Sequence, residues 1–353
     1  MRDLLSLLDD ARLLKLVTLL RQANNVVLCA HRSPDGDATG SCLAWADYLR
    51  GLHKKVAIVL PNPFPDFLRW LPNNEKIIFY DHKRELANQL VKEADLICCL
   101  DFNDLRRILD LGQAVEKSKA ALLVIDHHLF ADEAEQQTLK DLPAEQLLSF
   151  PELSSTCEIV FRLVCQLGGY DDMTKSTAAC IYTGMMTDTG AFTYNSSRPE
   201  VYQVISLLLE RGIDKDKIYR NVYNNYSVDR LRLEGYILHD KLQFYANNRA
   251  SIFTLTREEM QRFHFKRGDA EGIVNMPLQV KGMRLSISLR EDTERDVVRV
   301  SLRSVDDFPC NKMAQTFFNG GGHLNASGGE LACSLADAIK RAEEAIEAFS
   351  NLL

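Results

Sequence analysis

Short, nearly continuous apolar runs alternate with longer amphipathic stretches over the first third of the chain. The runs are rich in β-branched residues and fall at 26–30, 55–60, 76–80, 95–100 and 121–125. Continuous apolarity is typical of strands buried on both faces, as in a parallel sheet covered by helices. Stretches between the runs, such as 38–49 and 84–94, have helical patterns. This order predicts an α/β domain with a doubly wound, mainly parallel sheet.

The pattern changes after the middle of the chain. Two helical patterns, at 154–168 and 173–187, are followed by a polar helical stretch from about 200 to 240. Beyond Ala250 apolar and polar positions alternate, which indicates half-buried strands, and a glycine cluster and a C-terminal helix come last. The alternating segments are 249–256, 284–291 and 297–304. We therefore expect a smaller, mixed α+β second domain, with a cleft between the two domains. The expected division is a metal-binding catalytic domain over 1–200, a helical connector over 201–240 and a substrate-binding domain over 241–353.

Length and composition agree with two globular domains. The chain has 353 residues, more than the ~250–300 at which a single core stops growing. Nine cysteines are scattered without a CxxC pair, which favours buried thiols in a reducing compartment. The leucine-rich first 20 residues carry interspersed charges and predict an amphipathic helix, not a signal peptide or a membrane span. We expect a cytoplasmic protein with no membrane partner.

The formal net charge of −7 limits the partners. A protein that holds long nucleic acid by charge alone neutralises many phosphates with a basic stripe. The acidic balance therefore argues against binding of long duplexes, and it leaves small phosphorylated substrates open.

Histidine and aspartate side chains collect where the predicted strands and helices end. The motif H-x3-D-x-D follows the first strand in a loop that a proline and a glycine force to turn, and the triplet Asp-His-His closes the strand at 121–125. An acid at such an end is often only a helix cap. Four separate ends, however, deliver these residue types together. The candidate metal ligands are His31, Asp35, Asp37, Asp101, His127 and Asp188.

Carboxylates with imidazoles and no thiolate suit a moderately hard divalent ion. We expect Mn²⁺ in the first place, with Mg²⁺ and Co²⁺ as alternatives. Six ligands exceed what one open catalytic metal needs. Two ions ~3.5–4 Å apart, bridged by a carboxylate and a water, would use all six and produce hydroxide at neutral pH.

These residues resemble the DHH phosphoesterase family, named for the triplet found here at 126–128, and the resemblance covers nearly the whole chain. The family's first motif, H-x-x-P-D-x-D-x-x-G-S, is matched by HRSPDGDATGS at 31–41. The resemblance implies that Asp101 bridges the two metals. It places one metal on His31 and Asp35 and the other on Asp37, His127 and Asp188.

The resemblance also implies roles around the metals. His128 would orient substrate or deliver a proton, so that the implied catalytic residues are Asp101, His127 and His128. Arg107 matches a basic position of the second motif. For that arginine a structural salt bridge and a substrate contact both stay open.

The C-terminal half resembles the DHH-associated domain through 267–278, 297–304 and the glycine cluster at 319–329. Glycines permit close backbone approach to a phosphate, and a guanidinium offers a planar fork for phosphate oxygens. A glycine-rich turn with a buried histidine is the alternative. The implied substrate-binding residues are Arg303, Ser304, Gly321, Gly322 and His323.

The branch that the chain is most similar to implies the activity. It contains bacterial oligoribonucleases (nanoRNases) that also act on 3′-phosphoadenosine 5′-phosphate (pAp). We expect hydrolysis of short oligoribonucleotides to 5′-mononucleotides, of pAp to AMP and phosphate, or of both. Linear dinucleotides from cyclic-di-nucleotide turnover and polyphosphate stay open as alternative substrates, and a homodimer stays open as the assembly. An inactive nucleotide-binding module is disfavoured because all six candidate ligands are present.

Overall fold

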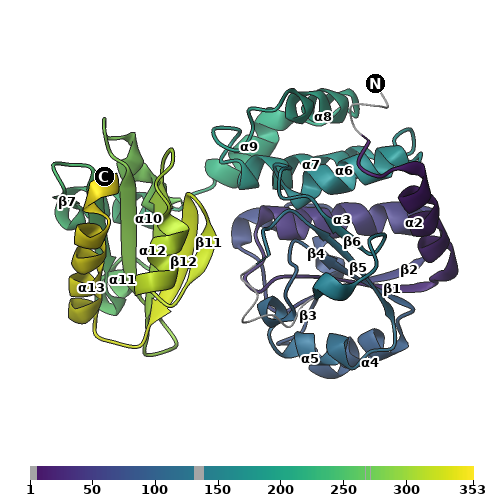
Figure 1. Ribbon diagram of the computed structural model, residues 1–353, viewed down its shortest axis with the longest axis horizontal. Coiled ribbons are helices and arrows are strands. Elements are labelled where there is room, and N and C mark those ends of the chain that lie inside the picture. The colour runs from purple at the N-terminus through teal and green to yellow at the C-terminus, as the bar shows by residue number, and fades with distance from the viewer. Residues whose placement is uncertain (1–5, 131–138, 267, 271) are drawn as a thin grey trace. The chain divides into compact units, whose positions relative to one another are not determined.

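The computed structural model describes residues 6–130, 139–266, 268–270 and 272–353. The chain forms two compact units, Met1–Asn225 and Tyr226–Leu353 (Figure 1). Their boundary falls inside the segment 201–240, which we expected as a connector. Its helices α8 (Pro199–Glu210) and α9 (Lys215–Tyr223) belong to the first unit, and α10 (Val228–Tyr236) belongs to the second.

The first unit contains a six-stranded sheet in which every pairing is parallel, in the order β3-β2-β1-β4-β5-β6. This confirms the predicted parallel α/β domain. The strand at 76–80 shortens to two residues, and one further short strand, β6, joins the sheet. The strands are β1 (Asn25–Ala30), β2 (Lys55–Leu60), β3 (Ile78–Phe79), β4 (Leu96–Leu100), β5 (Ala121–Asp126) and β6 (Leu147–Ser149).

Helices cover both faces of this sheet, and Figure 1 shows the strands between two helical layers. Alternate residues of β1 enter different cores: Val26 and Leu28 pack on one face, Val27 and Cys29 on the other. This two-sided burial is why the strands read as continuous apolar runs. On one side of the sheet lie α2 (Asp10–Gln22), α3 (Gly36–Gly51), α6 (Thr156–Gln166) and α7 (Lys175–Asp188), and α8 and α9 pack outside them on α7. The other side holds α4 (Arg84–Glu93) and α5 (Asp110–Glu116).

The second unit has a mixed six-stranded sheet in the order β11-β12-β10-β9-β8-β7. Only the β8–β9 pair is parallel, and this confirms the predicted mixed α+β architecture. The strands are β7 (Gln243–Tyr245), β8 (Ala250–Leu255), β9 (Leu285–Glu291), β10 (Val298–Ser304), β11 (Gly321–His323) and β12 (Ala326–Leu331).

One face of the second sheet packs on α12 (Cys310–Phe317) and α13 (Leu335–Ala348). On the other face α10 and α11 (Arg257–Arg262) cover β8, through Phe253 and Leu255. A π-helical turn (Ile237–Lys241) follows α10. Short 3₁₀ segments elsewhere in the chain are Asp66–Leu68, Asn74–Lys76, Leu105–Ile108, Leu139–Asp141, Ile273–Gln279 and Ser350–Leu352.

The length of the helices and the state of the cysteines complete the description of the fold. Over the described ranges, the helices are too short or too polar to cross a lipid bilayer. All nine cysteines are free thiols, and most of them are buried.

Candidate metal centre

Three neighbouring parallel strands bring their carboxyl ends to one edge of the first sheet. His31 follows β1, Asp101 follows β4, and Asp126 ends β5 with His127 and His128 directly after it. Because β1, β4 and β5 are adjacent in the sheet, these side chains meet. The chain runs outward in opposite directions from β1 and β4, and ligands of doubly wound sheets bind at such a switch point.

Two helix ends complete the cluster. Asp35 is the N-cap of α3, where its Oδ1 accepts hydrogen bonds from the backbone nitrogens of Asp37 and Ala38 at 3.0 Å each. Asp188 is the last residue of α7. The two helices pack closely because Gly184 has no side chain: a Cβ there would lie 2.9 Å from Asp37 Oδ1 and 2.2 Å from Cys157 Sγ.

Asp101 occupies the middle of the cluster. Its Oδ2 lies 3.2 Å from His31 Nε2, and its Oδ1 lies 3.6 Å from His127 Nε2. The backbone of Asp101 has a φ of 65°, a left-handed conformation that non-glycine residues adopt rarely and that concentrates at functional sites. One carboxylate therefore faces both histidines from a strained backbone position.

The remaining carboxylates surround the two histidines. His127 Nε2 lies 3.9 Å from Asp37 Oδ2 and 3.4 Å from Asp188 Oδ2. On the other side, His31 Nε2 lies 4.0 Å from Asp35 Oδ2. All six predicted metal-ligand side chains thus come together in the first unit.

Burial makes the ionisation of this cluster unusual. Asp37 and Asp101 are 0% and 1% exposed. Burial, together with the charge of Asp101, raises the pKa of Asp37 well above its usual range. Burial also raises the pKa of Asp188 to about 7, although the charge of His127 opposes the shift. The carboxylates repel one another when they are ionised, so a cation among them would relieve the repulsion.

In His127 and Asp101, by contrast, the pKa shifts favour the charged form: the pKa of His127 is raised and that of Asp101 is lowered. Burial alone would lower the pKa of His127, but Asp188, Asp101 and Asp37 raise it to about 9. Burial opposes ionisation of Asp101, yet the hydrogen bond with His31 and the histidine charges hold its pKa below the usual range. His127, Asp37 and Asp188 thus all have raised pKa values, and a metal ion that binds them would displace their protons.

The donor set could hold metal ions. Two groups of three side chains have ligand atoms that lie within 4.8 Å of one another inside the group. One group is His31, Asp35 and Asp101, and the other is Asp37, Asp101 and His127. Asp101 belongs to both groups. Carboxylate oxygens and imidazole nitrogens, without a thiolate among them, suit a moderately hard divalent cation.

His128 lies beside these groups. Its Nδ1 is 2.7 Å from Asp126 Oδ1 and 3.5 Å from Asp101 Oδ1, and the side-chain amide of Asn103 donates to its backbone oxygen at 3.1 Å. The buried carboxylate of Asp126 therefore fixes the orientation of the His128 ring through Nδ1.

Arg107 reaches the same edge of the sheet. Its backbone oxygen accepts from the backbone nitrogen of Arg32 at 2.7 Å. Burial and the positive charge of Arg107 both work to lower the pKa of His31, while the hydrogen bond with Asp101 raises it, and the net shift is upward. The guanidinium of Arg107 therefore acts electrostatically on the first histidine of the cluster.

The first turn of α6 also touches the cluster, and sequence reasoning missed it. Thr156 and Cys157 contact Asp37, and Thr156 contacts Asp101 as well. In the sequence this segment, SSTCE, indicates only where a helix begins. Its contacts span 55 to 120 residues of chain, so no local pattern could have revealed them.

The predicted substrate residues lie in the second unit. Arg303 and His323 both pair with Ala326 in the strand register, so they stand in one row across β10, β12 and β11. Both are half-buried. Ser304 points to the opposite face of β10, where its hydroxyl donates to the backbone oxygen of Phe308 at 2.8 Å.

The glycines of this unit differ from each other. Gly322 has a φ of 141°, and a Cβ there would lie 2.5 Å from the backbone oxygen of Ala326. At Gly321 a Cβ would meet no atom within 4 Å. In the motif at 267–278, Arg267 and Glu271 lie outside the described residues.

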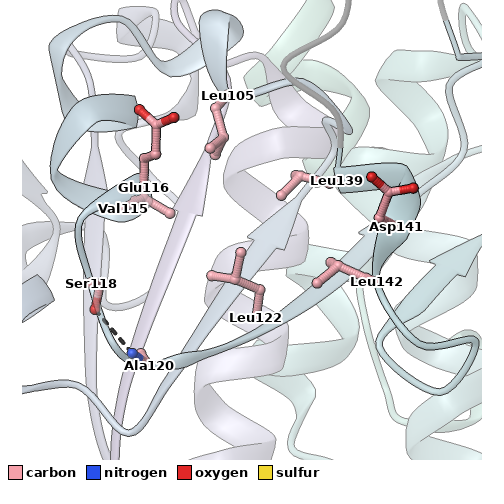
Figure 2. A pocket seen from close by; sticks show the side chains of 9 residues that line it. All are labelled: Leu105, Val115, Glu116, Ser118, Ala120, Leu122, Leu139, Asp141 and Leu142. Atoms are coloured by element: carbon pink, nitrogen blue, oxygen red, sulfur yellow. Dashed lines mark hydrogen bonds between the residues drawn. The ribbon is translucent and has the colours of Figure 1, made fainter.

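A pocket of about 340 Å³ lies elsewhere in the first unit, against α5 and the start of β5 (Figure 2). None of the predicted site residues is among those that line it. The lining residues are Leu105, Val115, Glu116, Ser118, Ala120, Leu122, Leu139, Asp141 and Leu142.

Comparisons with known proteins agree with the geometry. The profile of the "DHH family, N-terminal domain" matches residues 25–185, and that of the "DHHA1 domain" matches residues 253–351. A crystal structure of an exopolyphosphatase-related protein from Bacteroides fragilis is 47% identical, with a TM-score of 0.89 and coverage of 98% of both chains.

Two curated relatives carry the name bifunctional oligoribonuclease and PAP phosphatase NrnA. The protein from Bacillus subtilis is 26% identical over 90% of this chain and 92% of its own length. The protein from Thermus thermophilus is 28% identical over 91% of this chain and 89% of its own length. The similarity therefore spans both units of the chain.

Proposed function

The chain belongs to the DHH family of phosphoesterases, and from that premise we propose that it hydrolyses short oligoribonucleotides and pAp with the help of two divalent metal ions. The products would be 5′-mononucleotides from RNA, and AMP with phosphate from pAp. Two relatives whose names carry both activities, each similar over most of both chains, support this substrate class.

The observation that carries the proposal is the position of Asp101. Its two oxygens face different histidines, at 3.2 Å from His31 Nε2 and 3.6 Å from His127 Nε2. A carboxylate in this position suits a bridge between two ions, one held by His31 and Asp35 and the other by Asp37, His127 and Asp188. Such ions, of which Mn²⁺ fits the donors well, lower the pKa of water and stabilise charge that develops on a phosphoryl group.

Side chains of the protein would bind the substrate phosphate and deliver the proton. Asp126 fixes Nδ1 of His128 at 2.7 Å, so that Nε2 can hold a phosphate oxygen or donate a proton to the leaving group. Arg303 and His323, in one row of the second sheet, would bind substrate phosphate, with close backbone approach at Gly321 and Gly322. The face occupied by Ser304 makes its hydroxyl a poorer candidate for the same contact.

A substrate panel tests the proposal. The Mn²⁺-loaded protein would be assayed on pAp, on RNA of two to five nucleotides, on a 24-mer, on pyrophosphate and on polyphosphate. We expect turnover of pAp and the short RNAs, with the 24-mer much slower because a chain with a net charge of −7 is poorly suited to hold long RNA by charge. Absence of hydrolysis of every phosphate ester, with Mn²⁺ shown to be bound, would contradict the proposal.

Polyphosphate is the second candidate substrate. The relative that is 47% identical is described as exopolyphosphatase-related, and the metal centre would serve a phosphoanhydride as well as an ester. Turnover of polyphosphate above that of pAp at equal concentration would favour this candidate over the first.

A further inference from the structure

The first turn of α6 holds two carboxylates of the metal centre at once. The backbone nitrogens of Thr156 and Cys157 donate to Asp37 Oδ2 and Oδ1 at 2.7 and 2.8 Å. The hydroxyl of Thr156 donates to Asp101 Oδ1 at 2.9 Å. Thr156 is fully buried, so water does not compete for these hydrogen bonds.

Helix capping does not account for the hydroxyl of Thr156. Ser155 is the N-cap of α6, and its side chain accepts from the backbone nitrogen of Glu158 at 3.0 Å. The capping requirement of the helix is therefore met by the preceding residue. The hydroxyl of Thr156 is directed to Asp101 instead, a residue that lies 55 positions away in the chain.

A buried ion pair fixes this turn. Glu158 is fully buried and forms a salt bridge with Arg162 one turn along the helix. Its Oε2 also accepts from the backbone nitrogen and the hydroxyl of Ser154, at 2.9 and 2.6 Å. The segment before the helix and its first turn are thus tied together, which limits movement of Thr156.

We propose that Thr156 is a positioning residue of the metal centre, whose hydroxyl orients Asp101 for metal binding while the adjacent backbone amides orient Asp37. The inference rests on the metal centre of the proposed function. Neutral donors suit this task, because they stabilise the carboxylate charge without adding a cation that would compete with the metal. A carboxylate that is already hydrogen-bonded in its binding orientation loses less freedom when an ion binds.

The test measures Mn²⁺ affinity by calorimetry without substrate. Thr156→Val keeps the side-chain shape and removes the hydroxyl. We expect it to weaken Mn²⁺ binding by about 10–100-fold, which is typical when a group that hydrogen-bonds a metal ligand is lost. Thr156→Ser keeps the hydroxyl and should bind as the native protein does. If the valine does not fold, Thr156→Ala compared with Thr156→Ser isolates the hydroxyl at equal loss of the methyl group.

Thr183→Val is the matched control. Thr183 is also buried, but its hydroxyl donates at 2.7 Å to the backbone oxygen of Ala179 in its own helix. It should leave Mn²⁺ affinity unchanged. Saturating Mn²⁺ should restore much of the kcat of Thr156→Val towards pAp, because the ligands themselves remain.

Native Mn²⁺ affinity in a folded Thr156→Val protein would overturn the inference and leave the proposed function standing. Conversely, a native protein that binds Mn²⁺ and hydrolyses no phosphate ester would defeat the proposed function, while the affinity comparison would still decide the role of Thr156.

Discussion

The two units carry their chemistry in opposite ways. In the first unit ionisable side chains gather where strands and helices end, most of them are buried, and they come from five separate elements. In the second unit Arg303 and His323 stand half-buried in one row of an ordinary sheet. A buried cluster of like charges depends on a bound cation and on long-range packing, whereas a row on a strand depends only on register. Changes in the first unit should therefore abolish activity, and changes in the second should tune it.

Removing the central carboxylate should have the largest effect. Asp101→Ala deletes the group that faces both His31 and His127, so both metal positions lose a ligand. We expect no measurable hydrolysis of pAp and a loss of Mn²⁺ binding by calorimetry. Asp104→Ala is the control, because Asp104 lies three residues on and contacts Arg106 instead. Retained activity in Asp101→Ala would remove the bridging role.

The second largest effect should come from disturbing the helix packing behind the metal ligands. Gly184→Ala places a Cβ 2.9 Å from Asp37 Oδ1 and 2.2 Å from Cys157 Sγ, so α3, α6 and α7 must move apart. We expect a loss of about 1–3 kcal/mol in the free energy of unfolding, typical of overpacking, together with weaker Mn²⁺ binding. Urea unfolding of the metal-free protein measures the first effect. Gly51→Ala, where a Cβ meets no atom within 4 Å, should leave both unchanged.

The first unit should also respond to pH. A metal ion needs His127 neutral, and its pKa is raised to about 9. Apparent Mn²⁺ affinity should therefore rise with pH by up to about tenfold per unit until pH 9. Below pH 7 protonation of Asp188, whose pKa is raised to about 7, should weaken binding further. Calorimetry at several pH values, with proton release measured in two buffers, checks this. A flat affinity between pH 6.5 and 8.5 would be inconsistent with these shifts.

In the metal-free protein the raised pKa of His127 makes the stability of the fold decrease as the pH rises, whereas Mn²⁺ affinity increases. A folded pKa above the unfolded value of about 6.5 stabilises the fold below pH 6.5, and this contribution is lost as the pH rises through about 9. The raised pKa of Asp188 acts in the same direction between its unfolded value and pH 7. The metal-free protein should therefore melt at a lower temperature at pH 9 than at pH 6.5, and Mn²⁺ should reverse the difference.

Sequence patterns predicted the first sheet well, because strands buried on both faces are apolar throughout. The run at 26–30 became β1 over Asn25–Ala30, and that at 95–100 became β4 over Leu96–Leu100. β12, with the sequence ASGGEL, was missed, since its small residues give no alternation and pairing with β10 holds it in place.

The candidate metal centre could also be predicted from the sequence. Neighbouring parallel strands bring their carboxyl ends to one edge of the sheet, so acids and histidines at those ends must meet. The role of Thr156 could not be predicted from the sequence, because its contact with Asp101 depends on how α6 packs against the sheet. Strand alternation, in contrast, would have separated Ser304 from Arg303. Neighbouring residues on a strand face opposite sides, and this signal was present in the sequence.

A substitution in the second unit should have the smallest effect on activity, and it should change KM without changing Mn²⁺ affinity. His323→Ala removes a half-buried side chain from the row that contains Arg303 and leaves the metal ligands intact. We expect the KM for pAp to rise by about tenfold, the value of one lost hydrogen bond to a charged group, with kcat and Mn²⁺ affinity little changed. Leu324→Ala is the control, since Leu324 is exposed beside it. A native KM would remove the role of His323, and a collapse of kcat would mean that the second unit takes part in the chemical step itself.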